Sequence, residues 1–158
     1  MSPEDGRAGF SPDQVRTLAS VLDRIIPPSG DGRLPGAGEI GLAGAIEEAL
    51  RETPGRLAEV AEGLAALDGL ARSRGSEDFS ALPDPARLEA LGELEAARPE
   101  FLPGLVFHTY VGYYQDPRVV EALGLEARPP HPDGYEMEPG DLTLLDDVRR
   151  RTKLYREC

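Results

Sequence analysis

Proline and glycine occur so often along this chain that only short regular elements can form. The 158 residues include 15 prolines and 18 glycines. Proline removes a backbone donor, and glycine weakens both helices and strands. Leucine and alanine, with 21 and 18 residues, far outnumber valine and isoleucine, with 8 and 4, and this balance favours helix over sheet. We therefore expect an all-α protein, a compact bundle of about five to seven short helices.

Capping residues, prolines and apolar spacing mark where these helices begin and end. Ser11-Pro12-Asp13-Gln14 combines a capping hydroxyl, a first-turn proline and a glutamine three residues on, which is typical of a helix start. Apolar residues then recur at three- and four-residue steps until Pro27, the spacing of one helical face. The same criteria predict helices over 12–26, 40–53, 55–74, 84–98, 99–115, 117–123 and 141–151.

The chain divides by composition into three parts. We predict a flexible N-terminus over 1–10, a helical domain over 11–124, and an extended proline-rich segment with a short C-terminal helix over 125–158. The segment around His131 and Tyr135 contains Pro129, Pro130 and Pro132, which fix the backbone and exclude regular hydrogen bonding.

Charge and cysteine content exclude several classes of protein. The formal net charge of −12 opposes binding to the phosphate backbone of nucleic acids. A single cysteine, Cys158, excludes an intrachain disulfide. The longest uncharged stretch, 101–115, is shorter than the ~20 residues of a membrane span. The N-terminal residues show no export signal, so we expect a cytoplasmic location.

Two patterns with possible chemistry were weighed against simpler interpretations. Gly36-Ala37-Gly38-Glu39-Ile40-Gly41 fits the spacing of a dinucleotide-binding turn, but proline and glycine before it exclude the strand that such a turn requires. His108 and His131 are the only histidines, and neither follows a carboxylate at helical ligand spacing. We therefore assign no catalytic, cofactor-binding or metal-binding residue to this chain.

Tyrosines gather near one predicted helix end. Tyr110, Tyr113 and Tyr114 lie close together, and His131 and Tyr135 follow in the proline-rich segment. Tyrosine is frequent in protein interfaces because it combines a large apolar ring with a polar tip. These five residues are our predicted partner-binding set. The alternative, that the tyrosines pack beneath the C-terminal segment, remains open at this stage.

Three short motifs resemble the gluconate 2-dehydrogenase subunit 3 family. Residues 18–27 read L-x-x-x-x-D-x-I-I-P, residues 34–41 continue with Leu-Pro-Gly-Ala-Gly, and residues 110–117 end in Tyr-Tyr-Gln-Asp-Pro. The resemblance covers about two-thirds of the chain, from Ser11 to Leu123.

This resemblance implies a noncatalytic small subunit. Its partner would be the large subunit of a flavoprotein dehydrogenase of the glucose-methanol-choline type, which holds FAD, so no cofactor is expected in this chain. Many family members carry a twin-arginine export signal, which this sequence lacks; a periplasmic location would then require export with a partner. Two alternatives remain, an independent helical interaction module and a small metal-carboxylate enzyme that uses His108.

Overall fold

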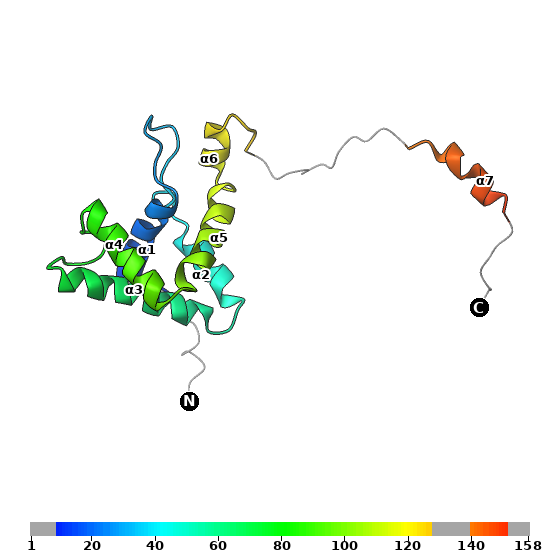
Figure 1. Ribbon diagram of the computed structural model, residues 1–158. Coiled ribbons are helices and arrows are strands. Elements are labelled where there is room, and N and C mark those ends of the chain that lie inside the picture. Colours follow the sequence, from blue (N-terminus) through cyan, green and yellow to red (C-terminus); the bar gives the residue numbers. More distant parts are fainter. Residues whose placement is uncertain (1–8, 128–139, 152–158) are drawn as a thin grey trace. The chain divides into compact units, whose positions relative to one another are not determined.

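The computed structural model describes residues 9–127 and 140–151, and every regular element in these ranges is helical. The all-α prediction is therefore confirmed. The chain divides into two compact units, residues 1–127 and 128–158, which are described separately below. The first unit is a bundle of α-helices, and the described part of the second is a single short helical segment (Figure 1).

The first helix, α1 (Pro12–Ile25), begins where the sequence predicts. The Ser11 hydroxyl accepts a hydrogen bond from the Gln14 backbone N–H at 3.2 Å, and the Gln14 side-chain oxygen accepts one from the Ser11 N–H at 2.8 Å. This reciprocal pair is a capping box, which satisfies two donors that a helix start leaves open. The helix ends before two successive prolines, which cannot continue it.

Helices α2 (Ala43–Arg51) and α3 (Arg56–Ser73) follow. The start of α2 lies three residues beyond the predicted position, Ile40. Gly41 explains the difference, because its φ of +77° is incompatible with a right-handed helix. The apolar spacing of the sequence continues through this turn, so spacing alone could not reveal the break.

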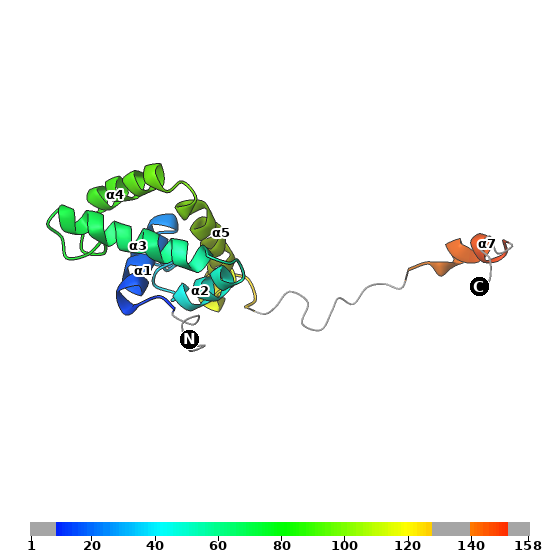
Figure 2. The ribbon, with the colours of Figure 1, turned by 90° about the horizontal axis from the view of Figure 1, so that it is seen from below.

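Helices α4 (Asp84–Ala97), α5 (Phe101–Tyr113) and α6 (Pro117–Ala122) complete the first unit. Helices α3 and α5 contact each other, and each also contacts α1, α2 and α4. Seen from below, α3 runs between α4 on one side and α1 and α2 on the other (Figure 2). Helix α6 follows α5 along the same side of the domain (Figure 1). Within the described parts of the chain, no helix combines the length and apolar character that crossing a membrane requires.

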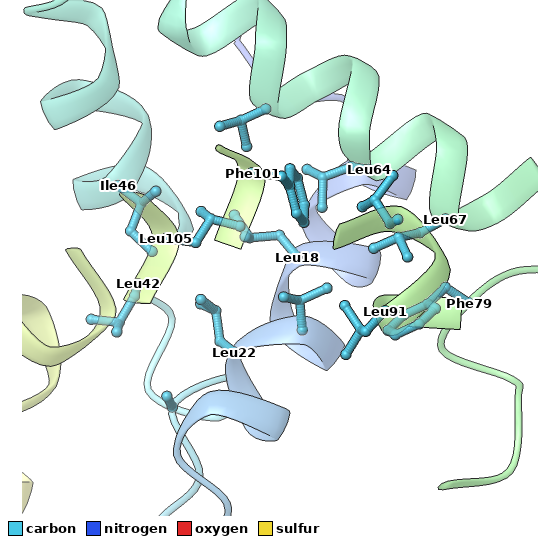
Figure 3. Close-up of a cluster of buried hydrophobic side chains, with 14 of the residues drawn as sticks. Leu18, Leu22, Leu42, Ile46, Leu64, Leu67, Phe79, Leu91, Phe101 and Leu105 are labelled. Carbon is cyan, nitrogen blue, oxygen red and sulfur yellow. The ribbon is translucent and has the colours of Figure 1, made fainter. Parts of the chain in front are cut away.

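The core lies where these helices meet, and leucine dominates it. Leu18, Leu64 and Leu105 are completely buried. Figure 3 shows Leu18 and Leu22 of α1 facing side chains of α3, α4 and α5. Full burial of such a side chain contributes roughly 1.5–3 kcal/mol to folding, so the leucine-rich stripes hold this domain together.

One buried carboxylate connects three segments within the core. Asp68 on α3 accepts hydrogen bonds from the Thr17 hydroxyl of α1 at 2.7 Å and from the Phe79 backbone N–H at 3.1 Å. Both donors are buried with it. A buried carboxylate is costly without partners, so these bonds explain why a charged side chain is tolerated here.

Phe10, the last residue of the predicted N-terminal segment, contacts the helical domain. Phe10 packs against the core, and its N–H donates to a Glu47 carboxylate oxygen at 2.9 Å. Residues 9 and 10 therefore belong to the folded domain, because a large apolar ring gains from burial. Residues 1–8 lie outside the described residues.

The described part of the second unit is a 3₁₀ turn, η1 (Leu142–Leu145), followed by α7 (Asp146–Arg149). The Asp141 carboxylate accepts from the Thr143 N–H at 3.0 Å and so caps the start. All four apolar side chains of the segment are exposed; they are Leu142, Leu144, Leu145 and Val148. The proline-rich residues 128–139 lie outside the described residues.

Candidate interaction site

Asp23 joins two of the motifs that the sequence analysis singled out. Its carboxylate, near the end of α1, accepts a hydrogen bond from the Gly38 N–H at 2.7 Å. The neighbouring Ala37 is completely buried and donates its N–H to the Ile26 carbonyl at 2.9 Å. Partial burial raises the pKa of Asp23, and the Gly38 hydrogen bond opposes this rise. Asp23 thus holds the loop after α1 against the helix.

The glycine motif of this loop serves close packing. A Cβ atom on Gly38 would collide with the carbonyl oxygen of Ala19, and one on Gly36 would collide with the Asp23 carboxylate. The motif lies in turns and α2 begins only after it, whereas a dinucleotide fingerprint joins a strand directly to a helix. The glycines are therefore explained by contact with α1.

Tyr113, one of the five residues of the predicted partner-binding set, lies in the core. Only 2% of its surface is exposed, and its hydroxyl donates to the Pro35 carbonyl at 2.8 Å. Burial raises the pKa of Tyr113, with smaller contributions from Tyr114 and Asp116. A buried ring cannot contact a partner directly, so Tyr113 instead links α5 to the loop after α1.

Asp116 and Arg118 fix the junction between α5 and α6. The Asp116 carboxylate caps α6 by accepting from the Arg118 N–H at 3.0 Å and also pairs with the Arg118 guanidinium at 2.8 Å. This pairing lowers the pKa of Asp116. The guanidinium of Arg118 also donates to the Ile40 carbonyl at 2.9 Å. The Asp-Pro motif therefore completes a network that anchors the end of α5.

Tyr110 and Tyr114 remain on the surface at this anchored end. Both are exposed, and their ring centroids lie 6.1 Å apart. The Tyr114 ring also meets the buried Tyr113 ring edge-on, with centroids 5.3 Å apart. Of the five predicted contact residues, the structure brings these two together on one exposed face. His131 and Tyr135 lie outside the described residues.

Sequence reasoning missed the other members of this face. Phe107 is 64% exposed, and Val111 is exposed as well. Together with Tyr110 and Tyr114 they occupy positions i, i+3, i+4 and i+7, which share one side of a helix. We call these four residues the α5 face. The signal that could have revealed it is the lack of any charged residue over 101–115, because an exposed helix normally has a charged side.

His108 lies beside the α5 face and is half-buried, with its ring edge-on to Phe107 at 5.3 Å. In the described ranges 9–127 and 140–151, no group of three or more histidine, cysteine, aspartate or glutamate side chains could hold a metal ion.

Comparison with known proteins identifies a family for most of this chain. A family model described as gluconate 2-dehydrogenase subunit 3 matches residues 12–129. The match includes all three motifs and α1 to α6. Neither the curated proteins nor the solved structures contain a significant match.

Proposed function

The chain belongs to the gluconate 2-dehydrogenase subunit 3 family, and on this basis we propose that it is a noncatalytic small subunit that binds and stabilises a flavin-dependent dehydrogenase. The family match carries this proposal because it spans α1 to α6, from Pro12 to Pro129. The large exposed apolar side chains of α5 support it, since contiguous apolar surface of this kind is typical of protein contact sites.

We further propose that FAD is held by the partner and that this chain contributes contacts alone. The residues on which its motifs depend are engaged in its own fold: Asp23 holds Gly38, Tyr113 holds Pro35, and Arg118 holds Ile40. These hydrogen bonds join the loop after α1 to α1, α5 and α6. Segments that are held in place before binding lose little conformational entropy on binding.

For location we propose the cytoplasm, with the periplasm only for a chain exported together with its partner. Fractionation of cells that express both subunits distinguishes these locations.

The experiment that tests the function is co-expression with a flavin-dependent dehydrogenase large subunit from the same genome. A tag on the small subunit is expected to recover the large subunit with bound FAD, measured by the visible absorbance of the flavin. The matched control is the large subunit expressed alone, for which lower soluble yield or lower flavin content is expected. Equal yield and equal flavin content with and without the small subunit, together with no co-purification, would overturn the proposal.

A second candidate, an independent interaction module with another client, is addressed by the same experiment. This candidate predicts that the chain does not co-purify with the flavoprotein, because the α5 face would bind a different protein. Metal analysis of the purified chain addresses the metal-carboxylate enzyme, for which stoichiometric metal is expected.

A further inference from the structure

We propose that the α5 face, Phe107, Tyr110, Val111 and Tyr114, inserts into an apolar groove on the large dehydrogenase subunit. This inference rests on the proposed function and assigns it a surface. The partner surface is defined by its chemistry: a concave, uncharged groove that receives one helix face, with hydrogen-bonding groups at its edge for the tyrosine hydroxyls.

The first observation is that α5 is apolar on every side but is covered on only one. Its inward side is formed by Phe101, Leu105, Thr109 and Tyr113, which are all buried. Its outward side carries the α5 face, and each of those four residues is exposed. A helix that is apolar all round is expected to be buried on all sides, so the outward side of α5 lacks a cover within the described residues of the first unit.

The second observation is that the apolar surface continues beside α5. A groove of about 270 Å³ lies between α1, α4 and α5. Its apolar lining includes Ile25, Leu88, Leu102 and Val106, and Leu88 and Val106 are exposed. Arg24 and Glu95 also line the groove, so the α5 face and this groove together form a mainly apolar surface with two charged side chains in its lining.

The area of this surface suits an interface core. Aromatic side chains present roughly 150–250 Å² each when exposed. The exposed fractions of the α5 face with Leu88 and Val106 therefore correspond to about 500 Å² of apolar surface. A stable interface buries about 800 Å² on each partner, with an apolar centre and a polar rim. The surface provides such a centre and leaves the rim to neighbouring polar residues.

Charge favours the dehydrogenase subunit over a second copy of this chain. Two copies joined at α5 would bring together two chains that each carry a net charge of −12. Like net charges oppose association, while an uncharged patch on an acidic protein can still bind an unlike partner. The family name identifies this chain as one subunit among others, so a dissimilar subunit is the occupant to which we commit.

The spacing of the four residues defines how contact occurs. Anchors at i, i+3, i+4 and i+7 are typical of a helix that lies in an apolar groove. The network at Asp116 and Arg118 fixes the end of α5, so the face is ordered before binding. Phe107 is the most exposed of the four, with 64% of its surface accessible, and it is expected to be the main anchor.

Affinity measurements with the full-length chain and its dehydrogenase partner test this inference. We expect Phe107→Ser and Tyr114→Ser each to weaken the complex by about 30-fold or more, the effect of losing a central anchor. Val15→Ser is the matched control because Val15 is also exposed, at 37%, but lies on α1. It is expected to change affinity less than about threefold. Circular dichroism and melting temperature establish that each variant is folded, and Tyr110→Ser replaces any variant that is not.

Each outcome decides a different question. If the wild type binds and the face variants bind equally well, the assigned surface is overturned while the proposed function stands. If the wild type fails to bind, the proposed function is overturned with it. Light scattering at high concentration tests the remaining occupant: a wild-type dimer that Phe107→Ser converts to monomer would show that a second copy covers the face and would overturn the inference.

Discussion

Asp23 is the residue on which the loop after α1 depends. Its carboxylate is partly buried, yet it makes a single hydrogen bond with a backbone donor, the Gly38 N–H. Burial disfavours the ionised form and is the largest cause of its raised pKa, with Glu39 adding repulsion. The ionised carboxylate is therefore unfavourable at this position. It is retained because the Gly38 N–H needs an acceptor there.

The raised pKa predicts a pH-dependent stability difference between the wild type and Asp23→Asn. Asparagine retains an oxygen that can accept from Gly38 but cannot ionise. Because the folded-state pKa of Asp23 lies above its ordinary value of 3.8, its stabilising contribution is complete below that value and is lost as pH rises through the raised pKa. The free energy of unfolding of the wild type, relative to Asp23→Asn, should fall as pH rises above the ordinary value of 3.8 and through the raised pKa. Urea unfolding across this range measures the difference.

Asp116→Asn is the control because the linkage has the opposite sign there. The Arg118 hydrogen bond lowers the pKa of Asp116 below its ordinary value of 3.8. The contribution of Asp116 is therefore present above that value and is lost as pH falls through the lowered pKa. If the difference in free energy of unfolding from the wild type changed with pH in the same direction for both variants, the raised pKa of Asp23 would be contradicted.

Tyr113→Phe tests whether this ring is structural. Removing the hydroxyl leaves the Pro35 carbonyl without its donor, which should reduce the free energy of unfolding by about 1 kcal/mol. Because Tyr113 is buried, we expect recovery of the dehydrogenase partner to remain unchanged. Chemical denaturation and co-purification measure the two effects. If Tyr113→Phe lost recovery of the dehydrogenase while its free energy of unfolding stayed unchanged, Tyr113 would contact the partner.

At the scale of elements, sequence predicted some helices better than others for a physical reason. The start of α1 follows from Ser11 and Gln14 alone, because capping is a local interaction. The sequence did not show which side of α5 faces the core, because a helix without charged residues has no polar side that marks the solvent. Tyr113 was therefore grouped with its exposed neighbours, and Phe107 was missed.

The same reasoning explains what the motifs could and could not predict. The motifs indicated the family, and hydrogen bonds join them in the fold: Asp23 accepts from Gly38, Pro35 accepts from Tyr113, and Ile40 accepts from Arg118. The hydrogen bond between Asp23 and Gly38 spans 15 residues, whereas those from Tyr113 to Pro35 and from Arg118 to Ile40 each span 78 residues. Spacing in sequence cannot reveal such distant pairings.

Helix α1 provides a direct test of the core. Leu22 is 1% exposed and faces the other helices (Figure 3), so Leu22→Asp would bury an unpaired carboxylate at a cost of several kcal/mol. Total stabilities of only about 5–15 kcal/mol make loss of the folded state the expected result, seen as loss of the far-UV helical signal. Val15→Asp, on the same helix but exposed, should remain folded. A Leu22→Asp chain with the wild-type melting temperature would contradict the assignment of this stripe to the core.

At the scale of the whole molecule, the family match and the first compact unit end at nearly the same place. The match ends at residue 129, and the first unit ends at Ala127. All but the first two residues of the second unit lie beyond the match. The apolar side chains of η1 and α7 are all exposed. A segment this short is not stable alone in water. We therefore expect η1 and α7 to be stabilised by contact with a partner.

A chain ending at Ala127 separates the roles of the two units. The core described above belongs to residues 10–119, so the truncated chain should keep its helical signal and a free energy of unfolding within about 0.5 kcal/mol of the wild type. Recovery of the dehydrogenase should nevertheless fall, because the truncation removes His131 and Tyr135 and the exposed leucines of η1.

Two linked contacts bind more tightly than either contact alone, since the first raises the local concentration of the second. A full-length chain with both His131→Ala and Tyr135→Ala keeps the leucines of η1. Its recovery of the dehydrogenase therefore shows how much of the loss is due to the proline-rich segment. If the truncated chain recovers as much dehydrogenase as the full-length chain, the first unit alone supplies the interface. If its melting temperature is lower than that of the full-length chain, the core of the first unit depends on the second unit.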